Sequence, residues 1–456
     1  MVNQYLSMNN TQISKYLTFV SFDKFNLWDT KRYTSSSINS TFPIVNLDEC
    51  IIEQNKKYKI FEDFEAEFGI LGVNNKEGIF DAYTQKGKEI NQPYKKMQTG
   101  WLAYNPYRIN IGSIGIKLDE HQNEYISPAY VVFSCKENLI PDFLFFLFKT
   151  STFNKVINES TTGSVRQNLT FEILKGLQIP LPTIEEQKII VNNYNAKLKL
   201  AQQQEEQINN LEAEIDKYLL DELGVEYKQD NFEERFGAFL RIYKYSEFDK
   251  WGADQRNSNK VIFNNSFEVK KIKDICTVSS GGTPSREKKE YYNGDIPWIK
   301  TGEVTNEVIY DTEEKITIEA IQNSNAKIYP KDSLIIAMYG QGATRGRTAK
   351  LGIDASTNQA CAVLTNIDNS VILTDYLWLY LMGEYERMRE MASGNNQPNL
   401  NAQMIKDYNV IIPSFEIQNK IINRINLLKA KIKELIDSSI ANRKSAIIEF
   451  EKKIFN

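Results

Sequence analysis

The chain of 456 residues contains a single histidine, His121, and only four cysteines, at positions 50, 135, 276 and 361. A zinc site or a histidine-dependent catalytic triad would have to rest on His121, which lies in the polar string Asp119–Glu124. We therefore expect His121 to be a surface loop residue without a catalytic role. The cysteines are widely separated and no pair has metal-ligand spacing, which is typical of a reducing compartment such as the cytoplasm.

Long apolar runs and an excess of positive charge are also missing. The longest apolar run, Phe143–Phe148, is far shorter than the ~18 residues of a membrane helix. Polar Met1–Thr11 lacks the basic start of a signal peptide, so we expect none. The net charge of −4 excludes binding of nucleic acid through bulk positive charge. A hydrophobic content of 41% indicates a globular chain, and its length predicts two to four domains.

The sequence repeats itself at long range. Shifted by 231 residues, Gly163–Asn195 aligns with Gly394–Asn426 without a gap, and ten of the 33 positions are identical. A second similarity opens each half, where Phe25-x-x-Trp28 corresponds to Phe248-x-x-Trp251. We interpret the chain as a tandem duplication in which similar edges surround dissimilar interiors.

Each copy is expected to begin with a globular part that mixes helices and strands. Short β-rich runs alternate with Gly, Asn and Pro turns and with helical stretches. The pattern predicts an α+β fold with two tandem mixed domains, over residues 1–182 and 225–413. The expected strands include Ala129–Phe133, Ser333–Met338 and Gln359–Leu364, and the expected helices include Asp142–Lys149 and Asp375–Met391.

A long helix is predicted after each globular part, over residues 183–224 and 414–456. Thr183 and Glu186 have capping-box spacing, and Ser414 occupies the corresponding place in the second copy. Apolar residues then recur with heptad-like spacing. The stripe runs through Val191, Tyr194, Leu198, Ala201, Ile208, Leu211, Ile215, Tyr218 and Leu219, and in the second helix through Ile421, Ile425, Leu428, Ile432 and Leu435, with Ile436, Ile440 and Ile447 beside it.

The two predicted helices carry opposite charge. Ala201–Glu222 has seven acidic residues and one lysine, whereas Lys429–Lys453 has seven basic and four acidic residues. Because amphipathic helices of opposite charge attract each other, we expect an antiparallel coiled coil that separates the globular domains by a fixed distance. The alternative is that each helix packs only on its own domain.

Each globular part contains one stretch that is free of acids and rich in bases, over residues 92–118 and 333–353. Arg and Lys for phosphates and guanines, with Asn and Gln for adenines, are the side chains that read duplex DNA. Two such stretches at corresponding places favour DNA binding over an ordinary solvated surface. The candidate contacts are Lys95, Lys96, Trp101, Tyr104, Asn105, Arg108 and Asn110 in the first stretch, and Tyr339, Gln341, Thr344, Arg345 and Arg347 in the second.

Other loops add candidate contacts with less weight, since each could equally be an ordinary turn. They contribute Arg166, Thr283, Ser285, Arg286, Trp298, Lys300, Asn396 and Gln397. Two motifs of nucleotide chemistry are incomplete. Gly342–Thr348 lacks the first glycine and the lysine of a phosphate-binding loop, and Tyr104–Tyr107 lacks the second proline of the adenine methyltransferase motif Asn-Pro-Pro-Tyr.

A further set of motifs recurs in order along both copies. It comprises the edges Gly163–Leu169 and Gly394–Leu400, the Ile-Pro-Leu-Pro-x-x-Glu-x-Gln segment Ile179–Gln187 with its weaker copy Val410–Gln418, and Gly112–Gly115, Ser127–Phe133, Ser280–Arg286 and Gly294–Trp298. In this order, and along essentially the whole chain, they resemble the specificity subunit of type I restriction-modification systems. The second copy departs from the pattern at Ile411, where the first copy has Pro180, and at Ile417, where the first copy has Glu186.

The resemblance implies two target-recognition domains, each reading one half of a split and asymmetric DNA site, with the antiparallel helices setting the gap between the half-sites. It implies no catalytic residue, metal or cofactor in this chain and no membrane. The implied partners are double-stranded DNA, two methyltransferase subunits that use S-adenosylmethionine, and restriction subunits that use ATP and Mg.

Two other functions stay open at this point. A self-contained restriction or methylation enzyme would need a catalytic motif that we do not find in the sequence. A coiled-coil protein scaffold, or a silent specificity allele, would use the helices without reading DNA.

Overall fold

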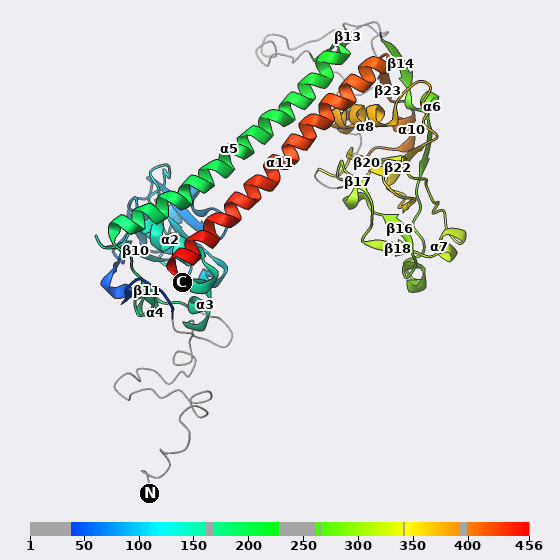
Figure 1. Cartoon of the computed structure of the whole chain (residues 1–456). Helices are drawn as coiled ribbons and strands as arrows, with labels where there is room; N and C mark the ends of the chain where they lie inside the picture. Colours follow the sequence, from blue (N-terminus) through cyan, green and yellow to red (C-terminus); the bar gives the residue numbers. More distant parts are fainter. Residues whose placement is uncertain are drawn as a thin grey trace. The chain divides into compact units, whose positions relative to one another are not determined.

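The computed structural model describes residues 38–160, 168–227, 261–263, 267–340, 343–391 and 399–455. The chain divides into two compact units. Unit 1 comprises Met1–Glu205 with Ile436–Asn456, and unit 2 comprises Glu206–Leu435. Each unit therefore combines one globular part with one half of each long helix, α5 (Ile184–Leu223) and α11 (Phe415–Ile454), which are the green and red helices of Figure 1.

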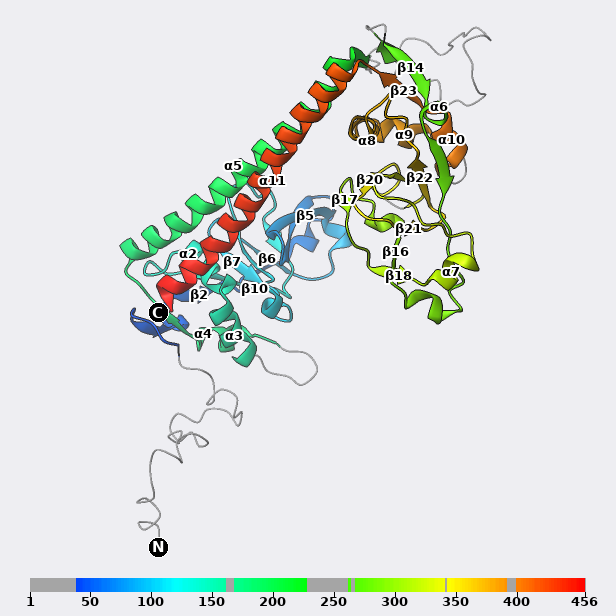
Figure 2. The same ribbon diagram turned by 45° about the vertical axis from the view of Figure 1, so that its right-hand side comes forward.

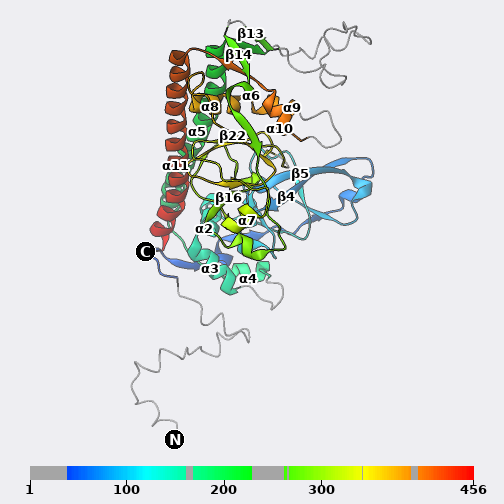
Figure 3. The same cartoon turned by 90° about the vertical axis from the view of Figure 1, so that its right-hand side faces the viewer.

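The described residues of unit 1 form three sheets. The strands are β1 (Ile44–Asn46), β2 (Ile51–Glu53), β3 (Lys57–Tyr58), β4 (Glu67–Asn74), β5 (Gly78–Lys86), β6 (Tyr94–Lys96), β7 (Leu102–Tyr104), β8 (Ile114–Ile116), β9 (Tyr125–Ile126), β10 (Val131–Cys135) and β11 (Gln178–Pro180). They are ordered β2-β10-β7-β8, β3-β6-β9-β4-β5 and β1-β11. Figure 3 shows the long hairpin β4–β5. The shorter helices are α2 (Pro141–Lys149), α3 (Ser151–Ser160) and α4 (Phe171–Lys175).

In unit 2, the part of the chain that the structure describes forms four sheets. The strands are β12 (Val225–Tyr227), β13 (Val261–Phe263), β14 (Glu268–Lys271), β15 (Thr277–Ser280), β16 (Ile296–Ile299), β17 (Val308–Ile309), β18 (Glu314–Ile316), β19 (Leu334–Ala337), β20 (Thr348–Leu351), β21 (Ser356–Thr357), β22 (Cys361–Thr365) and β23 (Asn409–Ile412). They are ordered β15-β22-β19-β20-β17, β18-β16-β21, β14-β23 and β12-β13. The shorter helices are α6 (Ile272–Ile275), α7 (Ile318–Gln322), α8 (Thr374–Gly383), α9 (Tyr385–Met391) and α10 (Ala402–Lys406).

The duplication predicted from the sequence is confirmed by the strand order. The order β2-β10-β7-β8 of unit 1 is matched in unit 2 by β15-β22-β19-β20, with the same antiparallel pairing between neighbours. The pair β1–β11 is likewise matched by β14–β23. Both of these pairs lead directly into a long helix, so the repeated edges frame equivalent folds.

The predicted strands and helices are observed with bounds shifted by one or two residues, with one exception. The helix expected over Asp375–Met391 is broken at Glu384, between α8 and α9. Glu384 is buried, where its carboxylate accepts hydrogen bonds from Arg387 and from the Tyr408 hydroxyl. Next to it, Gly383 lies against Leu219 so closely that a Cβ atom would stand 2.4 Å from Leu219 Cδ2. Periodicity alone does not reveal a break that tertiary contacts impose.

The predicted caps of both long helices are present. In unit 1, the Glu186 N–H donates to Thr183 Oγ1 at 3.3 Å and the Thr183 N–H donates back to Glu186 Oε2 at 2.9 Å, which completes a capping box. In unit 2, the Ile417 N–H donates to Ser414 Oγ at 3.4 Å. Ile417 has no carboxylate to return the bond, so the second helix keeps only half of the box.

The halves of α5 and α11 run antiparallel within each unit, as expected. In unit 1, contacts pass from Lys197–Glu449 through Gln204–Asn442 to Glu205–Ser439 as the numbering rises on α5 and falls on α11. In unit 2, Glu214 pairs with Arg424 and Glu222 pairs with Lys420. Three acids of the acidic stretch of α5 thus form ion pairs with α11, since Glu205 also pairs with Arg443. The other two partners, Arg424 and Lys420, lie before the basic stretch Lys429–Lys453.

The predicted apolar stripe of α5 is buried or half-buried throughout, whereas the stripe of α11 changes near its middle. Ile436 and Ile440 are 41% and 60% exposed, and Ser439 and Ala446 are buried in their place. The Ser439 hydroxyl donates to the backbone carbonyl of Ala201 at 3.4 Å. Small residues therefore occupy this part of the contact, where the two helix backbones approach each other.

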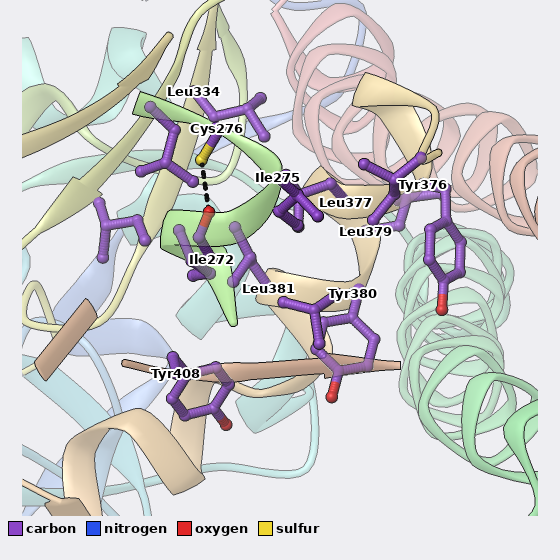
Figure 4. Packing of buried hydrophobic residues seen from close by; sticks show 14 of the residues in the cluster. Ile272, Ile275, Cys276, Leu334, Tyr376, Leu377, Leu379, Tyr380, Leu381 and Tyr408 are labelled. Carbon is purple, nitrogen blue, oxygen red and sulfur yellow. Dashed lines mark hydrogen bonds between the residues drawn. The ribbon is translucent and has the colours of Figure 1, made fainter. Parts of the chain in front are cut away.

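Each unit buries its helix halves in its own core. In unit 1, α2 lies beside α5 and α11 (Figure 2). Phe146 of α2 stacks on Tyr194 of α5 at 4.0 Å between ring centroids, and Phe450 of α11 packs on both. In unit 2, Ile421 and Ile425 join the cluster around α8 and α6, part of which is drawn in Figure 4. Within the described ranges, no helix combines the length and the apolar content needed to cross a membrane.

Candidate nucleic-acid interface

The two basic stretches cross equivalent hairpins. The first stretch contains β7 and β8, and the second contains β19 and β20. In each sheet the first strand of the hairpin pairs with the strand that precedes α2 or α8, namely β10 or β22. The correspondence expected from position along the sequence is therefore a correspondence in the fold. We call residues 105–113 hairpin loop 1 and the described residues 338–340 and 343–347 hairpin loop 2.

Both hairpin loops are closed in the same way. The Asn105 N–H donates to the Ser113 carbonyl at 3.1 Å, and the Ala337 N–H donates to the Arg347 carbonyl at 2.9 Å. Two residues before the second strand, Gly112 and Gly346 have φ angles of 86° and 87°. This left-handed conformation favours glycine, because a Cβ would strain it. The loops thus share a closing geometry and differ in the residues between.

The repeated edge motif packs against the same loops. The Leu169 N–H donates to the Pro106 carbonyl at 3.0 Å, and the Leu400 N–H donates to the Met338 carbonyl at 3.1 Å. Leu169 and Leu400 are both fully buried. The leucine that ends each repeated edge therefore attaches the start of the hairpin loop to the core of its own unit.

In the first basic stretch, residues 92–118, the structure leaves few basic side chains exposed and unpaired with an acid. Arg108 is exposed, and Asn105 and Asn110 are half-buried beside it. Lys96 is paired with Glu124 at 2.9 Å, and Lys117 is buried with its Nζ donating to the His121 carbonyl. The acid-free stretch therefore offers much less positive charge than its residue count suggests.

The candidate contacts predicted from the sequence do not include two large neighbours of Arg108, the aromatic Tyr107 of the same stretch and Ile111. Tyr107 and Ile111 are each 57% exposed, on either side of Arg108 in the loop. Large exposed apolar side chains beside an arginine can stack on bases or contact thymine methyl groups. Exposure is the signal, and a pattern of residue types does not reveal it.

Hairpin loop 2 presents its bases beside a cavity. Arg345, Arg347 and Thr344 are half-buried, and Tyr339 is exposed. The cavity has a volume of about 450 Å³ and is lined by Asn306, Ala343, Arg347, Tyr385, Glu386 and Arg389. Lys350, in the same basic stretch, lies between Asp332 at 3.3 Å and Asp375 at 2.7 Å, so its charge is balanced. Two arginines of the stretch and Arg389 of α9 are the cations gathered at this loop.

A separate cluster in unit 2 gathers Arg286, Trp298 and Lys300. The Arg286 guanidinium lies over the Trp298 ring at 4.9 Å and donates to Glu314 at 2.6 Å, and Lys300 Nζ contacts Glu313 and Glu314. The bond from Arg286 lowers the pKa of Glu314, and bonds to Glu313 and Glu314 raise the pKa of Lys300. Two cations facing two carboxylates give no net positive charge. Of the neighbours, Thr283 contacts Gln359 through its hydroxyl and Ser285 is exposed.

Three predicted contacts lie in the core, where packing accounts for them. Tyr104 is fully buried and donates its hydroxyl to the Leu169 carbonyl at 3.0 Å. Lys95 is 4% exposed and donates to the Tyr130 carbonyl, and Trp298 is 1% exposed with its indole N–H bonded to the Gly282 carbonyl. Trp101 is half-buried against the cluster of Met97 and Ile126. Arg166, Gln341, Asn396 and Gln397 lie outside the described residues.

His121 is a structural residue of a turn. It is half-buried, its Nδ1 accepts from the Leu118 N–H at 2.9 Å, and its Nε2 lies 3.0 Å from the Ile79 carbonyl. Both ring nitrogens are thus used to fix the turn after β8. Across the described part of the chain, no group of three His, Cys, Asp or Glu side chains is arranged to hold a metal ion.

The chain belongs to the family of the type I restriction modification DNA specificity domain, whose family model matches residues 81–211 and 264–441. It is similar to the specificity subunit of the MjaIX type I restriction enzyme of Methanocaldococcus jannaschii, with 30% identity over 202 residues, or 43% of each chain. The HindI specificity subunit of Haemophilus influenzae is 22% identical over 427 residues, which is 83% of this chain and 91% of that one.

A solved chain shares the fold at low sequence identity. It comes from a structural study of complex assembly and conformational transition in a type I restriction-modification system. The match has a TM-score of 0.59 and 13% identity, and it covers 92% of this chain and 99% of that chain. At this identity the likeness concerns the fold alone.

Proposed function

We propose that this chain is the DNA sequence-specificity subunit of a type I restriction-modification complex, in which each unit reads one half of a bipartite, asymmetric DNA site. The observation that carries the proposal is the equivalence of the two hairpin loops, which have the same closing geometry and different side chains at or near the surface. Loop 1 presents Arg108 between Tyr107 and Ile111, whereas loop 2 presents Arg345 and Arg347. Unlike loops read unlike base sequences, so the target is not a palindrome.

The chemistry of the loops fits base and phosphate contact. An arginine can donate two hydrogen bonds to a guanine or to a phosphate. The Oδ1 of Asn105 accepts from the Tyr107 N–H at 3.0 Å, which leaves its amide nitrogen as the group that donates to a base. The first hairpin loop exposes few basic side chains, and the net charge of the chain is −4. We therefore expect the chain alone to bind DNA weakly and in a salt-sensitive manner.

The partners are two methyltransferase subunits and the restriction subunits, which bring S-adenosylmethionine, ATP and Mg to the complex. The chain itself is not an enzyme and works in the cytoplasm. Exposed apolar side chains along the long helices support the docking of partners, because water-facing apolar groups at a helix pair favour burial. In unit 1 they include Ile189, Leu200, Ile436, Ile440 and Ile448, and in unit 2 they include Leu427 and Phe415.

Two rival functions are separated from this proposal by direct assays. A self-contained methylation enzyme would transfer the methyl group of labelled S-adenosylmethionine to DNA with the purified chain alone, which we expect not to happen. A scaffold that never touches DNA would leave DNA retention unchanged when the chain is added to its methyltransferase partner. We expect the chain to confer sequence-selective, salt-dependent retention.

The experiment that tests the proposal is methylation sequencing of DNA from cells that express the chain with its methyltransferase subunit. Cells that lack only this chain are the control. The expected result is a two-part adenine-methylated motif that disappears with the chain. Unchanged methylation alongside a well-formed complex would exclude DNA reading and favour a scaffold or a silent allele.

A further inference from the structure

In both units a basic side chain from outside the hairpin holds its loop. In unit 1, Lys149 at the end of α2 donates from Nζ to the Gly112 carbonyl at 3.2 Å. Its ammonium also lies over the Phe145 ring, 5.0 Å from the centroid. Burial lowers the pKa of Lys149, so this cation sits where water screens it little. The carbonyl bond therefore compensates for lost hydration.

In unit 2, two residues of α9 do the same for hairpin loop 2. Arg389 donates from Nη1 to the Arg345 carbonyl at 3.5 Å and to the Tyr385 hydroxyl at 2.6 Å. Tyr385 in turn donates to the Ala343 carbonyl at 2.7 Å. The Arg389 guanidinium also lies over the Tyr385 ring, at 5.1 Å. The two side chains thus bind two backbone carbonyls of the loop, those of Ala343 and Arg345.

The contacts fall near the same turn of each loop, on the Gly112 carbonyl in unit 1 and on the Ala343 and Arg345 carbonyls, just before Gly346, in unit 2. Gly112 and Gly346 are equivalent left-handed residues, and they are the points where the chain turns back into the second strand. A Cβ added to Gly112 would stand 3.7 Å from Lys149 Nζ, and one added to Gly346 would stand 3.2 Å from Arg389 Cγ. In each unit a helix outside the hairpin therefore contacts the loop near this turn. The helix is α2 in unit 1 and α9 in unit 2.

We propose that Lys149, and Arg389 together with Tyr385, are positioning residues that fix the two hairpin loops, each for its own half of the DNA site. This inference rests on the proposed function. A loop whose carbonyls are tied to the helix layer presents Arg108, or Arg345 and Arg347, in one conformation before DNA arrives. Ordering the loop in advance lowers the cost of binding.

Direct contact between these side chains and DNA phosphates is the rival explanation, and salt separates the two. A side chain that contacts a phosphate contributes about one unit to the slope of log affinity against log salt. A positioning residue changes the affinity while the slope stays the same. It also changes the hydrogen exchange of its loop in the absence of DNA, which a phosphate contact does not.

The test uses the full chain in complex with its methyltransferase subunits, and DNA that carries the methylated motif found for the wild type. Lys149→Met removes the ammonium while keeping the stem, and Tyr385→Phe removes one hydroxyl. Exposed Lys155 and Tyr310 provide the matched controls Lys155→Met and Tyr310→Phe. Lys149→Arg, which restores a donor, is expected to recover part of the loss.

For each variant we expect about 5- to 10-fold weaker binding, the effect of losing one or two hydrogen bonds. The loss is confined to one half-site: base changes in that half then matter less, while changes in the other half keep their wild-type effect. The Gly112 amide of Lys149→Met and the Gly346 amide of Tyr385→Phe are expected to exchange faster without DNA, and both salt slopes stay unchanged.

Three results would overturn the inference. They are wild-type binding by both variants, an equal loss of selectivity at both half-sites, and a salt slope reduced by one unit. None of them removes the proposed function as long as the wild-type complex reads the motif. If the wild-type complex itself shows no sequence preference, the proposed function fails first.

Discussion

The side chain of Gln187 accepts a hydrogen bond from the backbone N–H of Ile140 at 2.8 Å, and so ties the start of α2 to the start of α5. The Gln187 amide nitrogen also donates to the Asn138 and Pro182 carbonyls. Gln418 repeats the arrangement in unit 2, with bonds to Leu373 N–H, Val371 O and Pro413 O. The repeated Gln of the Ile-Pro-Leu-Pro motif therefore joins each globular part to its long helix.

Replacing Gln187 by Leu should destabilise unit 1 by about 2–4 kcal/mol, because buried backbone groups lose their partners while the side-chain volume changes little. Denaturant unfolding, with hydrogen exchange to locate the loss in unit 1, measures the effect. Gln207→Leu is the matched control at an exposed position of α5 and should change stability by less than ~0.5 kcal/mol. Equal effects of the two substitutions would contradict the assigned role.

Close packing, more than charge, should hold the helix pair of unit 1 together. Ala201 is fully buried against Ser439, and Ala201→Leu should cost about 1–3 kcal/mol by overpacking. Arg443 makes two hydrogen bonds to Glu205, but both side chains are about half exposed, so Glu205→Ala should cost less than about 1 kcal/mol. Thermal unfolding of both variants measures which substitution costs more stability. A larger loss of stability for Glu205→Ala than for Ala201→Leu would contradict this expectation.

Acid should loosen the contact between α11 and α3 in unit 1. Glu451 Oε1 accepts from the Thr152 N–H, the Thr152 hydroxyl and the Ser151 hydroxyl at 2.6–2.7 Å. Burial alone would raise the pKa of Glu451, but these bonds outweigh it and hold the pKa below its ordinary value of 4.5. The lowered pKa stabilises the fold above pH 4.5, and this contribution is lost as pH falls through the folded-state pKa.

Amide exchange in α3, followed from pH 7 downward, measures this effect. Relative to the intrinsic exchange rate, which itself falls with acid, it should rise below about pH 4.5 in the wild type. Glu451→Gln should show the faster relative exchange already at pH 7, with a weaker dependence on acid. Glu172→Gln, at an exposed position of the same unit, serves as the control. A wild-type profile that Glu451→Gln does not alter would show that this carboxylate is not the titrating group.

The cluster around Glu314 should contribute to folding more than to DNA binding. Arg286 and Lys300 face Glu313 and Glu314, so Arg286→Ala removes a cation whose charge is already balanced. We expect DNA affinity within about threefold of the wild type, equivalent to ~0.6 kcal/mol. DNA binding by the complex checks this, and a tenfold loss would make Arg286 a DNA contact.

Much of the frame follows from the sequence because it depends on local chemistry and periodicity. Thr183 with Glu186 marks the start of α5, and the stripe from Val191 to Leu219 marks its buried face. The equivalence of the two basic stretches also follows, since each lies at a similar distance before its repeated edge. These features need no knowledge of what packs against them.

The errors concern residues whose surroundings come from elsewhere in the chain. Tyr104 and Trp298 belong to a basic or polar context in the sequence, yet distant segments bury both. Glu384 interrupts a helix because Arg387 and Tyr408 hold its carboxylate. Arg389 lies 44 residues from Arg345, so no local pattern shows that it holds hairpin loop 2.

The central claim is that the two hairpin loops read separate half-sites, and methylation sequencing of loop variants tests it most directly. Cells would express the chain as wild type, Arg108→Ala, or Arg345→Ala with Arg347→Ala, each with the methyltransferase subunit. We predict that each variant loses about 1–3 kcal/mol of discrimination at bases of one half of the motif and keeps the other half intact. Equal relaxation of both halves by either variant, or an unchanged motif in both, would contradict the account.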